Sequence, residues 1–432
     1  MAADGRMRRA ISRRQLLVGL GGAAVAAGAV GVDRLVGSSH RRGAALVTAP
    51  SGAGAGSGRP SYLPRDAAHA FDAQRGVYNW TAANTVRHAA GLSRVRAGGA
   101  AAEVFIGDSL TAGDVGGATF DRLRAWPRIY AATLAADRVA EGGTGLIRVA
   151  DNRFSDARWH LGAGWHNDTT CAYAATTGAR ATLSSSTRGT AVAVIYRQAP
   201  RGGSFSVSVD GATDGPGFAV VRSRGAARLR RLELTGLADA AHTVEIRTLA
   251  ASAVVLIAAE IRSERGLICH NVGESGSSAS GAGLLSWSDT TTAGGAIQPL
   301  TLFAPQSGAY GPGVSTVHCA LGTNDLVRGA SPDEVTQAIQ VIHGACPDVD
   351  FILYLQPQPG LVAPVRWARL CTAMYTLADM LDVPLFDLQY LLGGYAHERA
   401  EGWVGDQKAH LDPAGYARWG AAVARVAVSS RA

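Results

Sequence analysis

Residues 103–113, EVFIGDSLTAG, place an acid and two hydroxyls directly behind a short apolar run. The run Val104-Phe105-Ile106 is too short for a helix and is followed by glycine, which predicts a buried strand that opens into a loop. Loops at strand ends are where α/β proteins usually build their sites. Asp108 and Ser109 either cap the next helix, because both types accept hydrogen bonds from free backbone N–H groups, or belong to such a site.

Helix and strand patterns alternate on both sides of this stretch, with a helix expected over 81–97 and another near 119–136. After residue 266 the alternation resumes. It predicts strands over 267–272, 314–321, 350–355 and 383–388 and helices over 332–343, 365–380 and 413–427. Ser331-Pro332-Asp333-Glu334 has the form of a capping box with proline at the first helical position. This order favours a three-layer α/β/α domain with a mostly parallel sheet.

The segment from 151 to 265 has a different pattern, in which apolar residues such as Phe205, Val207 and Val209 recur at every second position. Several short strands separated by turns, with no helical period between them, predict a β-sandwich. The α/β domain is therefore expected in two parts, residues 63–150 and 266–432, around an inserted β-sandwich domain over 151–265.

The N-terminal residues 1–37 have the pattern of a targeting signal. Ser12-Arg13-Arg14-Gln15-Leu16-Leu17, followed by a weakly apolar run to Val32, resembles a twin-arginine export signal. Residues 38–62 are rich in Gly, Ser, Ala and Pro, which predicts a flexible linker. The protein is therefore expected to be exported, either secreted or in the cell envelope, with no membrane contact beyond an uncleaved signal anchor.

Charge and cysteine content exclude several classes of function. The formal charge is +7, but residues 1–42 hold eight arginines against two acids, so the remainder is almost balanced and no nucleic-acid partner is expected. The five cysteines show no C-x-x-C spacing for zinc or redox chemistry, although Cys346 and Cys371 could pair outside the cell.

No metal and no cofactor are expected. His160 and His166 lie near acids but lack a helical H-x-x-x-H face or a cysteine partner. His270 and His318 lie inside strand-like runs, which favours core residues whose hydrogen bonds are satisfied.

Other polar clusters follow predicted strands or precede the last helix: Asn271 to Gly276, Gly322 to Asp325, and Gly405 to Pro413. Acyl transfer needs a nucleophile, a base, a carboxylate that orients the base, and N–H donors for the oxyanion. Ser109 can be the nucleophile, His410 the base, Asp406 the orienting acid and Asn324 a side-chain donor. The backbone N–H groups of Ser109 and of a glycine would complete the oxyanion hole.

Three blocks resemble those of the GDSL or SGNH hydrolases: Gly107-Asp108-Ser109-Leu110, Gly322-Thr323-Asn324-Asp325, and His410 followed by Leu411-Asp412-Pro413-Ala414-Gly415. The resemblance covers about 95–150 and 266–430. It implies a serine esterase on a three-layer fold. The ordinary α/β-hydrolase fold is disfavoured, because its G-x-S-x-G elbow does not occur in the chain.

Two of the site assignments, the glycine of the oxyanion hole and the acid that orients His410, each have an alternative. Gly276 fits the family's glycine block, while Gly143 lies in a second glycine-rich loop after the helix expected near 119–136. Asp406 precedes His410 by four residues where the family usually has three, so Asp412, on the helix side of His410, is the fallback for the acid.

The sequence thus predicts an exported serine esterase that hydrolyses carboxylic esters of acylated carbohydrates or lipids. An extracellular enzyme with an inserted sandwich favours glycan esters by analogy. The alternatives are an acyltransferase on the same site, or a non-catalytic surface protein that binds glycans through the sandwich. The oligomeric state is left open.

Overall fold

The structure is a computed structural model that describes residues 59–115, 122, 124–150, 156–168, 170–281, 285–288, 299–307, 309–311, 313–405 and 409–429. The expected export signal, and the expected linker up to residue 58, lie outside these residues. Within the described part of the chain, no helix is both long and apolar enough to cross a membrane.

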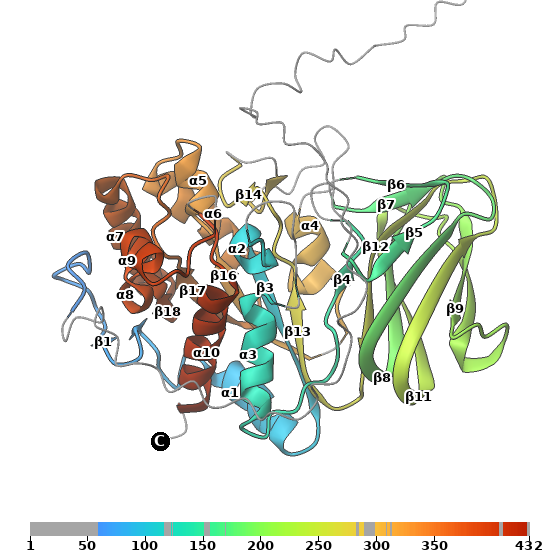
Figure 1. The fold of residues 1–432 in the computed structure, drawn as a ribbon, viewed down its shortest axis with the longest axis horizontal. Helices are drawn as coiled ribbons and strands as arrows, with labels where there is room; N and C mark the ends of the chain where they lie inside the picture. Colours follow the sequence, from blue (N-terminus) through green and yellow to red (C-terminus); the bar gives the residue numbers. More distant parts are fainter. Residues whose placement is uncertain are drawn as a thin grey trace, which may run out of the picture. The chain divides into compact units, whose positions relative to one another are not determined.

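A seven-stranded sheet forms the centre of the α/β domain, in the order β1-β2-β18-β17-β16-β3-β13 (Figure 1). Its strands are β1 (Phe71–Asp72), β2 (Val77–Tyr78), β3 (Ala100–Gly107), β13 (Gly266–Asn271), β16 (Val314–Ala320), β17 (Asp350–Leu355) and β18 (Leu385–Asp387). The five strands from β18 to β13 are parallel, whereas β2 pairs antiparallel with both β18 and β1. The carboxyl ends of the parallel strands therefore lie at one edge, where sites of open α/β sheets form.

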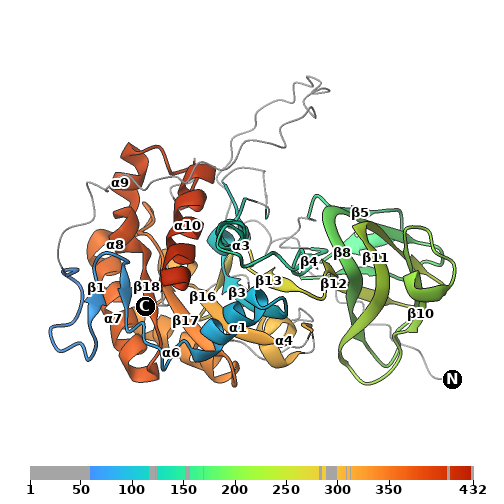
Figure 2. The same cartoon turned by 90° about the horizontal axis from the view of Figure 1, so that it is seen from below.

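Helices cover both faces of this sheet (Figure 2). They are α1 (Val86–Arg96), α2 (Ser109–Ala112), α3 (Trp126–Ala135), α4 (Pro299–Phe303), α5 (Thr323–Val327), α6 (Pro332–Gly344), α7 (Pro364–Leu381), α8 (Leu388–Leu392), α9 (Gly394–Ala400) and α10 (Pro413–Ser429). Alternate residues of β3 serve opposite cores: Phe105 packs with α1, α3 and α10, and Val104 packs with α6 and α7. The predicted three-layer α/β/α fold is confirmed.

The inserted region forms a separate sheet of nine antiparallel strands. They are β4 (Ile147–Arg148), β5 (Trp159–Leu161), β6 (Trp165–Asn167), β7 (Ala172–Ala174), β8 (Arg180–Gln198), β9 (Ser204–Val209), β10 (Phe218–Arg222), β11 (Arg228–Thr248) and β12 (Val254–Arg262). The long strands β8 and β11 pair along most of their length, and the sheet encloses a core of its own (Figure 2). Phe205, Val207 and Val209 all point into that core, as their alternation predicts.

Smaller elements also occur in the described part of the chain. The strands β14 (Ser277–Ser278) and β15 (Leu285–Ser286) form a short parallel pair. Two 3₁₀ turns cover Gly215–Gly217 and Pro305–Ser307.

Most predicted elements occur within a few residues of their expected bounds. The capping box at Ser331 is present, with the Glu334 side chain accepting from the Ser331 backbone N–H at 2.6 Å. The first helix begins at Val86 instead of residue 81, because Thr81 and Asn84 exchange side chain–backbone hydrogen bonds in a turn. The helix expected over 119–136 is described from Trp126 to Ala135, and residues 116–121 and 123 lie outside the described part.

The cysteine pairing left open by the sequence does not form. Cys346 and Cys371 are both free and buried, and both belong to the same hydrophobic core as Val104. Burial raises the pKa of the Cys346 thiol to about 12, which makes it unreactive at neutral pH.

Candidate active site

Ser109 begins α2 directly after the central strand β3 ends at Gly107. The side chain of Asp108 accepts a hydrogen bond from the Leu110 backbone N–H at 2.9 Å, so Asp108 caps this short helix. Ser109 has 8% of its surface exposed. Both interpretations of the opening stretch thus apply: the acid caps the helix, and the serine is presented at the sheet edge.

Ser109 and His410 form a hydrogen bond, with 2.8 Å between Oγ and Nε2. His410 lies in the polar loop before α10 and is 9% exposed. A carboxylate oxygen of Asp114 lies 3.8 Å from the same ring nitrogen. A serine hydroxyl within hydrogen-bond reach of an imidazole is the geometry of an activated nucleophile and its general base.

Only one of the two candidate acids can be placed. Asp406 lies outside the described residues. Asp412 accepts a hydrogen bond from the Gly415 backbone N–H at 2.7 Å and so caps α10. The fallback carboxylate therefore has a helix-capping role at the position the structure gives it.

The structure brings Asn324 and the loop that contains Gly276 together beside the end of β3. The Asn324 side chain donates to the Ser277 carbonyl at 2.8 Å. The Ser277 hydroxyl in turn donates to the Gly107 carbonyl at 3.3 Å. Gly276 has φ +76°, a conformation in which a side chain would be strained.

Gly143 lies elsewhere. It forms an antiparallel bridge to Arg262 at the end of β12, in the inserted sheet, and a Cβ there would meet the Ile261 carbonyl oxygen at 2.4 Å. Its φ of +152° and this close backbone contact explain why the position is glycine. Of the two candidate glycines, only Gly276 belongs to the loop that reaches Gly107.

Two arginines, Arg148 and Arg122, contact the loop that contains Gly276. Arg148 of β4 forms a fully buried ion pair with Glu274, and its guanidinium also donates to the Gly273 carbonyl at 3.2 Å. Arg122 donates to the same carbonyl at 3.0 Å. The Arg148 guanidinium also lies 4.9 Å from the centre of the Phe303 ring. Sequence analysis missed these residues, because a single arginine in a two-residue strand gives no signal of its distant partner.

A buried amide links the ends of three strands beside Ser109. Gln356, just after β17, donates to the Asp108 side chain at 3.1 Å and accepts from the Thr323 hydroxyl at 2.7 Å. Burial raises the pKa of Asp108 to about 7, an effect that the hydrogen bonds from Leu110 and Gln356 partly offset. Gln356 was also missed, since no motif marks it.

A small cavity opens beside His410, lined by Leu110, Gln358, Tyr395, Glu398, His410 and Leu411 among others. It contains about 240 Å³ of space, part of it continuous with solvent. Glu398 is 3% exposed, and burial raises the pKa of its carboxyl to about 8.

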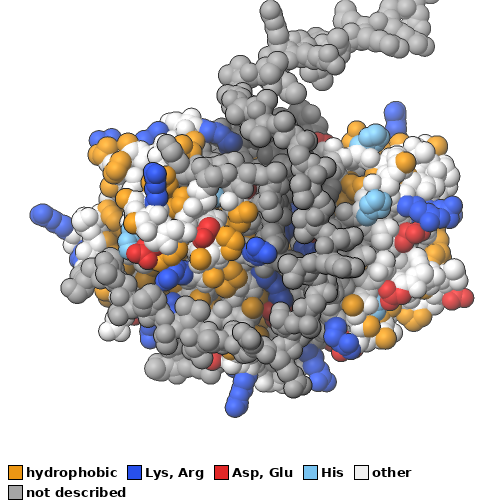
Figure 3. Space-filling view, viewed as in Figure 1, with side chains coloured by type: hydrophobic (Ala, Val, Ile, Leu, Met, Phe, Trp, Pro, Cys, Tyr) orange, Lys and Arg blue, Asp and Glu red, His pale blue; other side chains and the backbone are white. Residues whose placement is uncertain are grey.

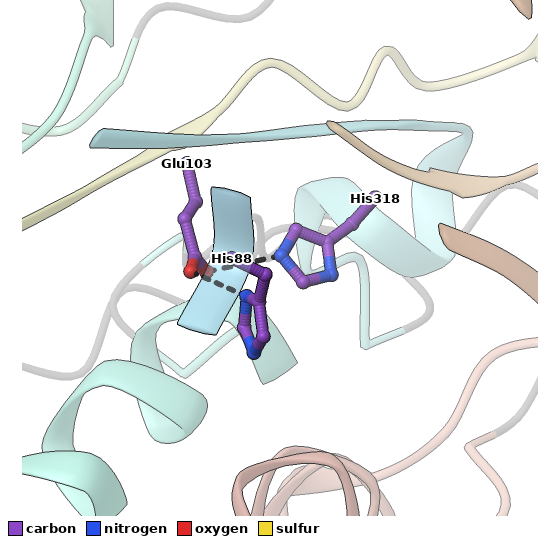
Figure 4. Close-up of side chains that lie close together, drawn as sticks. All are labelled: His88, Glu103 and His318. Atoms are coloured by element: carbon purple, nitrogen blue, oxygen red, sulfur yellow. Dashed lines mark hydrogen bonds and ion pairs between the residues drawn. The ribbon is translucent and has the colours of Figure 1, made fainter. Parts of the chain in front are cut away.

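His88, Glu103 and His318 form a cluster in the core beneath the site (Figure 4). Each oxygen of the Glu103 carboxylate meets one imidazole, at 2.9 Å for His88 and 3.0 Å for His318. His318 also contacts the Tyr354 hydroxyl at 2.8 Å. Burial acts to raise the pKa of Glu103, but attraction to His88 and hydrogen bonds from both histidines outweigh it and hold that pKa well below its usual range.

The nitrogen and oxygen atoms of this cluster lie within 4.8 Å of one another, a spacing that could hold a metal ion. A hydrogen bond to His318 and an ion-pair contact with His88 already occupy the two carboxylate oxygens, and all three side chains are buried at 1% exposure or less. We therefore interpret the cluster as a hydrogen-bonded part of the core, as expected for His318. His88 was missed because it lies on a helix without a motif.

Comparisons with known proteins find similar folds but no relative by sequence. No family model and no curated protein matches the chain. The chain shares its fold with a peptidoglycan O-acetylesterase. That structure is 16% identical with a TM-score of 0.57, over 79% of this chain and 95% of the other. A carbohydrate acetylesterase from Sinorhizobium meliloti is 15% identical over 38% of this chain and 79% of its own, with a TM-score of 0.28. A family two carbohydrate esterase from Cellvibrio japonicus is 13% identical over 67% of this chain and 99% of its own, with a TM-score of 0.26. The last two scores are too low to compare folds.

Proposed function

We propose that the chain is an exported serine esterase of SGNH type that removes acyl groups, acetyl groups in particular, from carbohydrates. The observation that carries the proposal is the 2.8 Å hydrogen bond between Ser109 Oγ and His410 Nε2 at the carboxyl edge of a parallel sheet. The proposal accounts for a buried serine, a distant histidine and an amide side chain that converge on one strand end.

In the proposed reaction, Ser109 Oγ attacks the ester carbonyl while His410 accepts the hydroxyl proton. The backbone N–H groups of Ser109 and Gly276 and the side-chain amide of Asn324 stabilise the oxyanion. His410 then protonates the leaving alkoxide, and water hydrolyses the acyl-enzyme with His410 again as base. Asp406 is proposed to orient His410.

The glycan substrate is supported by the common fold with a peptidoglycan O-acetylesterase and by the signal-like sequence Ser12 to Leu17. A fold alone does not determine a substrate, so the glycan ester is part of the proposal. On the face drawn in Figure 3, the Arg side chains of the described residues lie among acidic and apolar ones. That surface offers no concentrated positive charge for a polyanion.

The experiment uses the purified protein with a fluorophosphonate probe and with O-acetylated glycans. We expect the wild type to be labelled and to release acetate, and Ser109→Ala to lose both properties. Ser93→Ala, at an exposed serine of α1, is the matched control and should behave like the wild type. An unlabelled, inactive wild type would favour the non-catalytic alternative. Acetate transfer to an added sugar in preference to water would favour the acyltransferase.

A further inference from the structure

Glu398 is a buried carboxyl group, one oxygen of which has no hydrogen-bond partner among the residues that the structure describes. It lies on α9, is 3% exposed, and its Oε1 contacts no donor. Two other buried carboxylates of the α/β domain have close partners for their charge: Glu103 meets two histidines, and Asp387 accepts from two tyrosine hydroxyls at 2.7 Å each. A buried polar group that lacks a partner is costly, and such groups occur where a ligand supplies the partner.

The carboxyl of Glu398 lines the cavity beside His410. The other walls come from Leu110 next to the nucleophile, from Gln358 after β17, and from Tyr395 one helical turn before Glu398. A cavity lined by both apolar and polar groups, one of them with a strongly perturbed pKa, has the character of a ligand site.

The cavity lies on the histidine side of the nucleophile. None of its lining residues comes from the Gly276 loop or from α5, which carries Asn324. The carbonyl oxygen of a bound ester would point towards those two elements, whereas the leaving alcohol takes its proton from His410. The cavity therefore fits the alcohol part of the ester rather than its acyl part.

We infer that Glu398 is a specificity residue, whose carboxyl group hydrogen-bonds a hydroxyl group of the sugar that forms the alcohol part of the ester. This inference rests on the proposed esterase function and names a contact for its substrate. Substrate binding would give Glu398 Oε1 a partner that the described residues do not supply.

The protonation state of Glu398 suits this role. Burial raises the pKa of Glu398 to about 8, so that at neutral pH the carboxyl is uncharged and can both donate to and accept from a sugar hydroxyl. The other ionisable groups that line the cavity are His410 and Tyr395. His397 and Arg399 flank Glu398 on α9, and Arg418 of α10 lies over the neighbouring Trp403 ring.

The test compares two acetate esters with different alcohols. 4-Nitrophenyl acetate has no sugar, whereas an O-acetylated methyl glucoside has free hydroxyls. Glu398→Leu removes the hydrogen bond and keeps an apolar side chain, Glu398→Gln keeps a donor and an acceptor, and Glu401→Gln is the control at an exposed glutamate just after α9.

We expect Glu398→Leu to lower kcat/KM for the sugar ester by about 3- to 10-fold relative to the aryl ester, the effect of one neutral hydrogen bond that only the sugar can form. Glu398→Gln and Glu401→Gln should keep the wild-type ratio between the two esters. In the wild type this ratio should also change as the pH passes about 8, where Glu398 ionises, and in Glu398→Gln it should not.

Equal loss on both esters in Glu398→Leu would overturn the inference, because it would indicate a structural role. A wild-type ratio in Glu398→Leu would overturn it as well. Failure of the proposed function looks different: the wild type itself would hydrolyse neither ester, and Ser109→Ala would change nothing.

Discussion

Ser109 Oγ and His410 Nε2 are hydrogen-bonded at 2.8 Å although 301 residues separate them in the chain. The contact forms because β3 ends at the same edge of the sheet where the loop before α10 returns. The whole inserted sheet lies between the two residues in sequence, yet it leaves their alignment intact. A hydroxyl–imidazole pair formed by such distant segments is held by the fold itself, which is the preorganisation that nucleophilic catalysis needs.

Asn324 should act on the transition state and not on substrate binding. Loss of one side-chain donor of an oxyanion hole typically costs about 10²–10³ in turnover. We therefore expect Asn324→Ala to lower kcat by roughly that factor with little change in KM, measured by steady-state hydrolysis of an aryl acetate. Its side chain also donates to the Ser277 carbonyl, so the melting temperature should be recorded alongside. An effect confined to KM would mean that Asn324 only binds substrate.

The two candidate acids should differ in their effects. If Asp406 orients His410, Asp406→Asn lowers kcat strongly because the imidazole loses its correct tautomer. Asp412→Asn keeps an oxygen that can accept from Gly415, so both the cap of α10 and the activity should be largely preserved. Steady-state kinetics of the two variants decides between them. A larger loss of kcat in Asp412→Asn would show that the acid assignment is wrong, while the serine esterase could still act through a dyad.

The α/β core and the convergence of polar strand ends were predictable, because each depends on local signals. Short apolar runs followed by glycine indicate β3 and β16, and the capping box at Ser331 indicates the start of α6. The two-residue strands β1, β2 and β4 give no such signal, since their pairing is decided by neighbours far along the chain. In the site, Ser109 and His410 were predictable for the same reason as β3 and β16, because they stand in recognisable sequence blocks.

The supporting residues of the site have no motif. Gln356, Arg148 and Glu398 become visible only through their spatial neighbours, namely Asp108, Glu274 and the cavity beside His410. Buried polar contacts between distant segments depend on the packed structure, so a single sequence does not reveal them.

The ion pair between Arg148 and Glu274 should matter for both stability and turnover. Arg148→Met leaves the Glu274 carboxylate buried without this cation, and breaking a buried pair in this way typically costs about 3–5 kcal/mol. The Gly273 carbonyl also loses one of its two arginine donors, so the Gly276 loop should be less well placed and kcat should fall.

Denaturant unfolding and aryl ester kinetics measure the two effects of Arg148→Met. Arg222→Met, at an exposed arginine of β10, is the control and should change neither. Adding Glu274→Leu to Arg148→Met should recover much of the stability, because it also removes the second buried charge of the pair. If the single variant unfolds like the wild type, the ion pair does not hold the loop.

Glu398 should make the stability of the protein depend on pH in a defined window. The unfolded chain loses the Glu398 proton near the ordinary pKa of 4.5, whereas burial keeps the folded protein protonated up to about pH 8. The folded state therefore binds more protons between these values, and this group lowers the free energy of unfolding as the pH rises from about 5 to about 8.

Glu398→Gln cannot ionise and lacks this contribution. Since each unit of pKa shift corresponds to about 1.4 kcal/mol, the variant should become more stable than the wild type by up to a few kcal/mol. Melting temperatures of both proteins from pH 5 to 9 test this: the difference should be small at pH 5, grow to pH 8 and then level off. A constant difference across the range would show that Glu398 is ionised in the folded protein at neutral pH.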